Sequence, residues 1–170
     1  MSSDFTRIKN LHNFGSSPDT NLLILTGISG SGKTTTSSRL KSHYAPADVI
    51  HLDAYFGTMP DSLQSKGFNA YMSTHRPLQT DWPLSIIRLI FDYARAAYGT
   101  KQIIAEGLHW IDPVVKEDED IWDAIKDRKI PIVVCECDIE TASRRSCNED
   151  AIDEAFQQIW KQNIIELLED

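Results

Sequence analysis

Short apolar runs alternate with stretches of helical spacing along this chain from residue 22 onward. Four of the runs are rich in Ile, Leu and Val and have the length of buried strands. They cover residues 22–25, 48–53, 102–106 and 131–137. The segments between and after them lack helix breakers or repeat apolar residues every three or four positions, which predicts helices over 32–43, 81–99, 116–128, 139–145 and 151–168.

The helix expected from residue 81 has the clearest signals. Asp81 suits the N-cap, Pro83 suits the first turn, and Gly99 suits the residue after the last turn. Its apolar residues recur at helical spacing, namely Ile86, Ile87, Ile90, Phe91 and Ala94.

Two segments fall outside this alternation. Residues 1–20 contain Phe5, Ile8 and Leu11, whose spacing predicts a helical turn or two. Residues 54–80 are long and irregular, with Gly and Pro residues along their length. A loop of this length in a compact domain is usually functional or disordered, and we interpret it as a substrate-binding insert.

Strands that alternate with helices predict an α/β fold, with a parallel sheet, right-handed crossovers and helices on both faces. Ligands of such sheets bind beyond the carboxyl ends of the strands. Gly27, Asp53, Glu106 and Asp138 each lie at or just after such an end. We therefore expect these four residues to border one crevice.

A glycine-rich stretch at this crevice, Gly27-Ile28-Ser29-Gly30-Ser31-Gly32-Lys33-Thr34, fits the phosphate-binding loop pattern. Its glycines permit backbone conformations in which successive N–H groups turn inward around an anion. Lys33 is expected to reach the outer phosphates and the Thr34 hydroxyl to bind Mg²⁺. The first helical turn, which includes Thr35, adds its N–H groups and dipole. A chance glycine-rich turn is the alternative, but the strand before the loop and the helix after it favour phosphate binding.

Composition narrows the function further. The 170 residues suit one domain, and 41% hydrophobic with 25% charged residues is ordinary for a globular protein. The net charge of −8 disfavours binding to long nucleic acids, which requires many Lys and Arg side chains. The odd number of cysteines, three, indicates a reducing compartment rather than a disulfide framework. Without an apolar run of membrane-spanning length or a signal-peptide core, the sequence predicts a cytoplasmic protein with no membrane partner.

Two carboxylates are candidates for the chemistry. Asp53 ends the second predicted strand, where it could hold Mg²⁺ or act on a nucleophile beside the phosphate loop. The alternative for Asp53 is a turn-forming residue, which is common after strands. Glu106 is followed by Gly107, so the chain can turn sharply and leave the carboxylate facing the metal.

Histidine and arginine residues give weaker signals. A packed or partly exposed side chain is the favoured interpretation of His51, whereas His109 is a candidate for substrate contact because it follows Glu106 closely. Arg144 and Arg145 lie on the short helix after the fourth strand. They could be surface cations, yet arginine is well suited to clamping a phosphoryl group during transfer.

Together these stretches resemble the small-molecule P-loop kinases, above all the uridine kinase and nicotinamide riboside kinase group. The resemblance spans roughly residues 22–145, and beyond the phosphate loop it is carried by His51-Leu52-Asp53-Ala54-Tyr55-Phe56, Ile104-Ala105-Glu106-Gly107 and the stretch from Cys137 to Arg145. It implies a P-loop NTPase-type sheet. That group has a fifth strand near its C-terminus, and because none is predicted after Ala151, four strands are expected, possibly five.

The resemblance also implies roles for individual residues. Asp53 takes the place of the proposed base, Glu106 and Thr34 those of the Mg²⁺ ligands, and Arg144 or Arg145 that of a contact to the ATP phosphates. Asp53 as a carboxylate of the metal's outer shell is the alternative to the base.

The implied function is ATP-dependent phosphoryl transfer to a hydroxyl of a small, nucleoside-like molecule by a single domain, residues 1–170, with 54–80 as its insert. Two alternatives remain, a nucleotide or polynucleotide kinase and a nucleotide-binding module without transfer activity. The module is favoured by the acidic character of residues 146–153, where the family has further basic residues.

Overall fold

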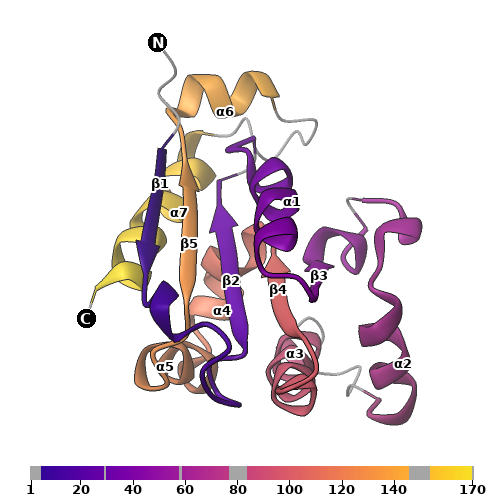
Figure 1. The fold of residues 1–170 in the computed structure, drawn as a ribbon. Coiled ribbons are helices and arrows are strands. Elements are labelled where there is room, and N and C mark those ends of the chain that lie inside the picture. The colour runs from indigo at the N-terminus through magenta and orange to yellow at the C-terminus, as the bar shows by residue number, and fades with distance from the viewer. Residues whose placement is uncertain (1–4, 29, 58, 77–83, 146–153, 170) are drawn as a thin grey trace.

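A five-stranded sheet forms the centre of the protein (Figure 1). The computed structural model describes residues 5–28, 30–57, 59–76, 84–145 and 154–169. The strand order is β1-β5-β2-β4-β3. The strands are β1 (Phe5–Lys9), β2 (Leu22–Gly27), β3 (Ala47–His51), β4 (Gln102–Glu106) and β5 (Ile132–Glu136).

Helices and short 3-10 turns connect these strands. The α-helices are α1 (Lys33–His43), α2 (Lys66–Thr74), α3 (Leu84–Ala97), α4 (Pro113–Lys116), α5 (Glu119–Asp127), α6 (Ile139–Arg145) and α7 (Glu154–Leu168). The 3-10 turns are η1 (Leu11–Asn13), η2 (Leu52–Ala54), η3 (Asp61–Leu63) and η5 (Leu108–Ile111). The predicted α/β class is therefore confirmed.

The four predicted strands pair in parallel, and the fifth strand is one that the sequence analysis missed. Residues 5–9 were expected to form a helical turn, but they form β1, which pairs antiparallel with β5. Three apolar residues are too short a pattern to outweigh the backbone hydrogen bonds that the open edge of β5 offers. The Arg7 guanidinium adds two hydrogen bonds of 2.6 Å to the Glu136 carboxylate. Only Leu11 of the three lies in a helical turn, η1.

Alternate residues of β2 supply the cores on the two faces of the sheet. Leu23 and Leu25 pack in the cluster that includes Leu40 of α1, whereas Leu22 and Ile24 pack in the larger cluster with α3, α5 and α7. Figure 1 accordingly shows α1 in front of the sheet and α4, α5 and α7 behind it. Helices on both faces explain why every residue of β2 is buried.

The predicted helices differ from the observed ones mainly where acidic residues cluster. The helix expected over 116–128 begins only at Glu119, as α5, because the Asp118 side chain accepts a hydrogen bond from the Ile121 N–H and caps α5. The short helix α4 before it was not predicted. In the same way Asp112 caps α4 by accepting from the Val114 N–H. The proposed cap at residues 81–83 and residues 151–153 of the last predicted helix lie outside the described residues.

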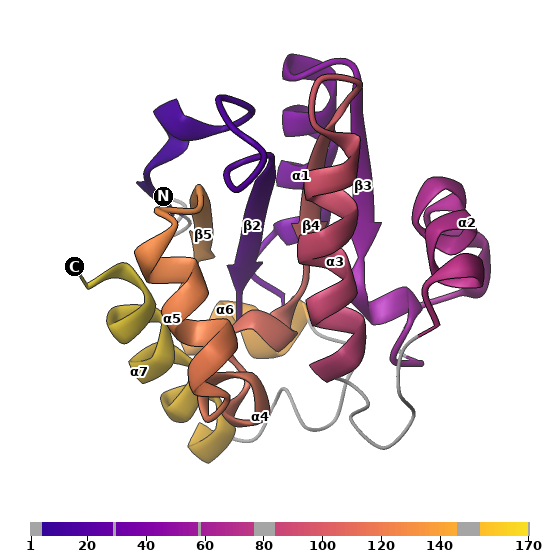
Figure 2. The same cartoon turned by 90° about the horizontal axis from the view of Figure 1, so that it is seen from below.

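The segment after Asp53 is not irregular throughout, as was expected. It contains α2, which stands beside β3 and apart from the body of the sheet in Figure 2. Ser65 caps α2 by accepting a hydrogen bond from the Phe68 N–H. The sequence analysis did not predict this helix, because only Phe68 on it is fully buried and it carries no long apolar repeat at helical spacing.

A partly buried polar cluster anchors α2 to the sheet. The Asp48 carboxylate on β3 accepts hydrogen bonds of 2.7 Å from the Ser65 hydroxyl and from the Tyr93 hydroxyl on α3. Burial, with the hydrogen bond to Asp48, raises the pKa of Tyr93, so its hydroxyl stays a donor. Gly67 leaves the room this cluster needs, since a Cβ there would overlap the Tyr93 hydroxyl.

No helix among the described residues is long and apolar enough to cross a membrane.

Phe68→Ala tests how firmly the insert is built into the core. Phe68 is 0% exposed and its ring packs against those of Tyr55 and Tyr93. The substitution should lower the free energy of unfolding by about 3–5 kcal/mol, the usual cost of such a cavity. Leu63→Ala, where the side chain is 43% exposed in the same insert, is the matched control and should cost about 0.5 kcal/mol or less. Urea unfolding measures both, and equal losses would contradict the anchoring described above.

Candidate functional site

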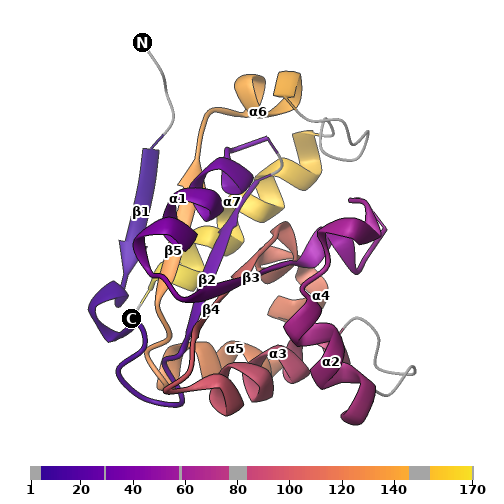
Figure 3. The same ribbon diagram turned by 45° about the vertical axis from the view of Figure 1, so that its right-hand side comes forward.

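The glycine-rich loop joins β2 to α1 at the carboxyl end of the parallel strands (Figure 3). β2 continues into α1 on one face of the sheet, whereas its neighbour β4 continues through η5 toward the helices on the other face. Connections that leave neighbouring strands toward opposite faces open a crevice between them, where α/β proteins bind ligands. The loop therefore lies at the point of the sheet best suited to a ligand.

Close packing fixes the shape of the loop. Gly30 has a φ of 84°, and a Cβ there would overlap the carbonyl oxygen of Ala142 on α6. Gly27, with a φ of 151°, has the same relation to the carbonyl oxygen of Cys135 on β5. Only glycine fits both constraints, so the loop is held directly against β5 and α6.

Lys33 lies folded back over the loop. Its side chain is 7% exposed, and the ammonium donates hydrogen bonds to the carbonyl oxygens of Gly27 (3.1 Å) and Ile28 (3.0 Å). Burial lowers the pKa of Lys33, and the negative charges of Glu106 and Asp53 oppose that lowering. Both carboxylates thus lie within electrostatic reach of this ammonium.

Glu106 is positioned by a histidine on the next strand. The Glu106 side chain is 2% exposed, and its Oε2 lies 2.6 Å from Nδ1 of His51. The two residues are register partners on β4 and β3. Because an ionised carboxylate only accepts hydrogen bonds, His51 donates this one and fixes the direction of the carboxylate.

Asp53 lies just beyond β3 rather than at its end. β3 ends at His51, and Asp53 sits in η2, because the chain turns there instead of extending the strand as predicted. Its Oδ1 is 3.6 Å from Nδ1 of His109 in η5, whose ring packs at 4.3 Å between centroids on that of Phe56. Burial lowers the pKa of His109 against the opposing charge of Asp53, so a neutral ring is favoured beside this carboxylate.

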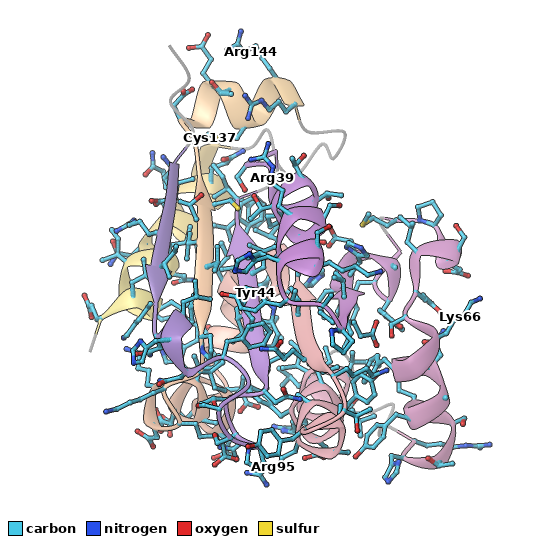
Figure 4. All side chains as sticks on the ribbon, in the orientation of Figure 1. Arg39, Tyr44, Lys66, Arg95, Cys137 and Arg144 are labelled. Carbon is cyan, nitrogen blue, oxygen red and sulfur yellow. The ribbon has the colours of Figure 1, made fainter. Side chains whose placement is uncertain are left out.

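The two arginines of α6 have different surroundings. At the start of α6 the Asp138 carboxylate accepts hydrogen bonds from the Thr141 N–H (2.7 Å) and hydroxyl (2.9 Å). Asp138 therefore orders α6 at the rim of the crevice. Arg144 extends from the side of α6 that faces away from the sheet (Figure 4). Arg145, in contrast, lines a cavity beside the loop.

This cavity has a volume of about 490 Å³ and lies between α1, the strands β1 and β5, and α6. Its walls come from five separate elements: Thr6, Ser31, Gly32, Thr35, Thr36, Arg39, Cys135 and Arg145. Cys135 is buried, and its thiol donates a hydrogen bond to the Thr36 hydroxyl. Thr6 and Arg39 were not singled out from the sequence, because the sequence does not reveal that β1 pairs with β5 and so lies close to α1.

The predicted site residues divide clearly in space. Gly27 to Ser31 belong to the loop, apart from Ser29, which lies outside the described residues, and Thr34 and Thr35 are exposed on the first turn of α1. The structure brings Asp53 and Glu106 to the β4 side of the loop and Arg145 to the β5 side, with Lys33 folded over the loop between them. His51 was interpreted as a packed or partly exposed side chain, and its bond to Glu106 could be anticipated only once the order of the strands was known.

Neither the comparison with protein-family models nor the comparison with curated proteins returned a match for this chain. The proposals below therefore depend on the residues and geometry of the site and on the resemblance stated for the sequence.

Gly30→Ala and Gly32→Ala form a matched pair for the packing of the loop. Both residues have a positive φ (84° and 95°), so alanine should cost each about 1–2 kcal/mol of stability. At Gly32 the new methyl group meets open space, whereas at Gly30 it meets α6. Gly30→Ala should therefore lose more stability in urea unfolding and should speed amide hydrogen exchange in α6. Identical behaviour of the two variants would show that α6 does not rest on the loop.

Proposed function

We propose that this protein is a P-loop NTPase-type kinase that transfers a phosphoryl group from ATP to a hydroxyl of a small molecule. One observation carries the proposal: the Lys33 ammonium of the loop lies within electrostatic reach of Glu106, at the end of β4, and of Asp53, just after the neighbouring β3. A phosphate cradle, a cation and two carboxylates on one rim supply what phosphoryl transfer requires, namely positioning and charge stabilisation.

The loop is suited to hold the triphosphate. The carbonyl oxygens of Gly27 and Ile28 hold the Lys33 ammonium in the structure described, and phosphate oxygens would replace them. Hydrogen bonds between two charged partners are about twice as strong as neutral ones, so the exchange favours bound phosphate. The N-terminal turn of α1, with Thr34 and Thr35 exposed, adds N–H donors and the helix dipole.

The residues beside the loop also fit Mg²⁺. No group of three or more His, Cys, Asp or Glu side chains within the described ranges could hold a metal ion by itself. Mg²⁺ needs less, because it is commonly held by one or two carboxylates together with substrate phosphates and water. Glu106 and the Thr34 hydroxyl would be the protein ligands of the ion, and Asp53 could bind a water molecule of its outer shell. When bound, the ion would neutralise charge on the outer phosphates.

The transfer step places Asp53 at the acceptor hydroxyl. The hydroxyl oxygen forms a bond to the γ-phosphorus while the bond from that phosphorus to the β–γ bridging oxygen breaks, and ADP leaves. Asp53 accepts the hydroxyl proton as the new bond forms. Lys33 offsets the negative charge that develops on the transferring group. Arg145, on the other side of the loop, would contact the donor nucleotide, whereas Arg144 faces away and contributes only if α6 turns.

The acceptor side is best explained by a small molecule with a ring. Phe56 and His109 place two rings, in contact and tilted by 42°, next to Asp53, and α2 closes the outer side of β3. Ring stacking suits a nucleoside-like acceptor. The net charge of −8 remains an argument against a long polynucleotide.

A panel of acceptors with γ-labelled ATP and Mg²⁺ tests the function directly. Nucleosides and other small hydroxyl compounds should accept label, and nucleotides and oligonucleotides should not. Label on nucleotides would favour the alternative kinase. ATP binding without transfer to any acceptor would favour the nucleotide-binding module.

Lys33→Ala should abolish transfer and raise the Kd for Mg-ATP at least about tenfold, because it removes the loop's own cation from the outer phosphates. Calorimetry and the label assay measure the two effects. Lys41→Ala, two turns further along α1, is the matched control and should behave like the wild type. Unchanged ATP affinity and turnover in Lys33→Ala would remove the loop from the proposed site.

Asp53→Asn should leave ATP binding intact and lower turnover by a factor on the order of 10² or more, the usual scale of general-base catalysis. Asparagine keeps the shape and one oxygen but cannot accept the proton. Asp61→Asn, which changes an exposed carboxylate in η3 of the same insert, should have no such effect. Normal turnover in Asp53→Asn would make Asp53 a turn residue and leave Glu106 or His109 as the base.

A further inference from the structure

The cavity beside the loop lies on the side away from the two carboxylates. In the strand order β1-β5-β2-β4-β3, Glu106 belongs to β4 and Asp53 follows β3, both on one side of β2. The cavity is lined by Cys135 of β5 and Thr6 of β1, both on the other side of β2. The loop, with Ser31 and Gly32, lies between the two regions.

This arrangement sets the direction in which a nucleotide must lie. In a phosphate loop the lysine reaches the outer phosphates, and the backbone and first helical turn hold the inner ones. Glu106 and Asp53, the carboxylates proposed for Mg²⁺ and for the acceptor, lie on the β4 side of the loop, so the outer phosphates lie on that side. The inner phosphate then lies at Ser31, Gly32 and Thr35, all of which line the cavity, and the sugar and base must continue into it.

We propose that the cavity binds the nucleoside part of the donor nucleotide and that the N-terminal strand β1 forms one wall of this site. The proposal rests on the proposed function and assigns β1 a role in nucleotide recognition. A volume of about 490 Å³ lies in the range of small-molecule sites, which begins near 300 Å³. Arg39 and Arg145 bring planar guanidinium groups suited to stacking on a base, and the Thr6 and Thr36 hydroxyls can bond to its edge or to the sugar.

The wall that β1 provides is firmly held. Thr6 pairs with Cys135 in the antiparallel register, and the Cys135 thiol bonds to the Thr36 hydroxyl on α1. The two hydrogen bonds between Arg7 and Glu136 fix the same end of β1 on the opposite face of the sheet. A recognition residue on a paired strand is placed more precisely than one on a loop.

Thr6→Trp tests this site, because the larger side chain should fill the cavity without altering the phosphate loop. Ile8→Trp is the matched control: Ile8 lies two residues along β1 on the same face, is 56% exposed and does not line the cavity. Calorimetry should compare Mg-ATP with Mg-tripolyphosphate, which has the phosphates but no nucleoside. Thr6→Trp should weaken ATP binding about tenfold or more, on the scale of losing one stacked base, and leave tripolyphosphate binding unchanged.

Photolabelling of the wild type with 8-azido-ATP gives a second measurement that does not depend on a folded variant. The label should be found in the peptides that contain Thr6 or Arg39. Label confined to residues 54–76, or ATP binding by a folded Thr6→Trp variant equal to that of Ile8→Trp, would overturn the proposal. If the wild type bound tripolyphosphate as tightly as ATP, the nucleoside site would also be overturned, whereas phosphate binding by the loop would still stand. Binding of neither compound would instead refute the proposed function itself.

Discussion

The parallel pairing of β2 with β4 on one side and with β5 on the other is the constraint on which the rest of the structure depends. It brings the carboxyl ends of three strands to one edge, although they are far apart in the sequence. The glycine-rich loop leaves the middle strand, so it has a neighbour on each side. The β4 side supplies Glu106 and its partner His51, and the β5 side supplies α6 and the cavity. The two sides thereby receive different chemistry.

Burial of charge shapes the β4 side. An isolated ammonium or carboxylate in this environment would be costly, and each buried charge has a partner accordingly. Lys33 uses loop carbonyl oxygens and the field of two carboxylates, and Glu106 uses His51. These contacts hold the side chains close to the positions that phosphates and a metal ion would require.

Two segments whose structure the sequence analysis did not predict, α2 and β1, lie at opposite edges of the proposed site. Beyond β3, the insert carries α2, which is tied down by Asp48, Ser65 and Tyr93. Beyond β5, the N-terminal residues form an edge strand instead of a helical turn. In both cases a partner elsewhere in the chain decided the structure: the partly buried Asp48 carboxylate for α2, and the open edge of β5 for β1.

The sequence by itself determined the four parallel strands, most of the helices and the loop with Lys33, because these depend on local spacing and on glycine. It also placed Glu106 at the end of a strand and Asp53 near the end of another, since the chain order of strands and acids is explicit, although Asp53 lies in the turn after β3. Only the tertiary structure decided that His51 directs Glu106, that Arg145 rather than Arg144 lines the cavity, and that Thr6 lies near Arg39. The physical reason is that strand order and register come from long-range backbone pairing and face-to-face packing, and no window of neighbouring residues contains that information.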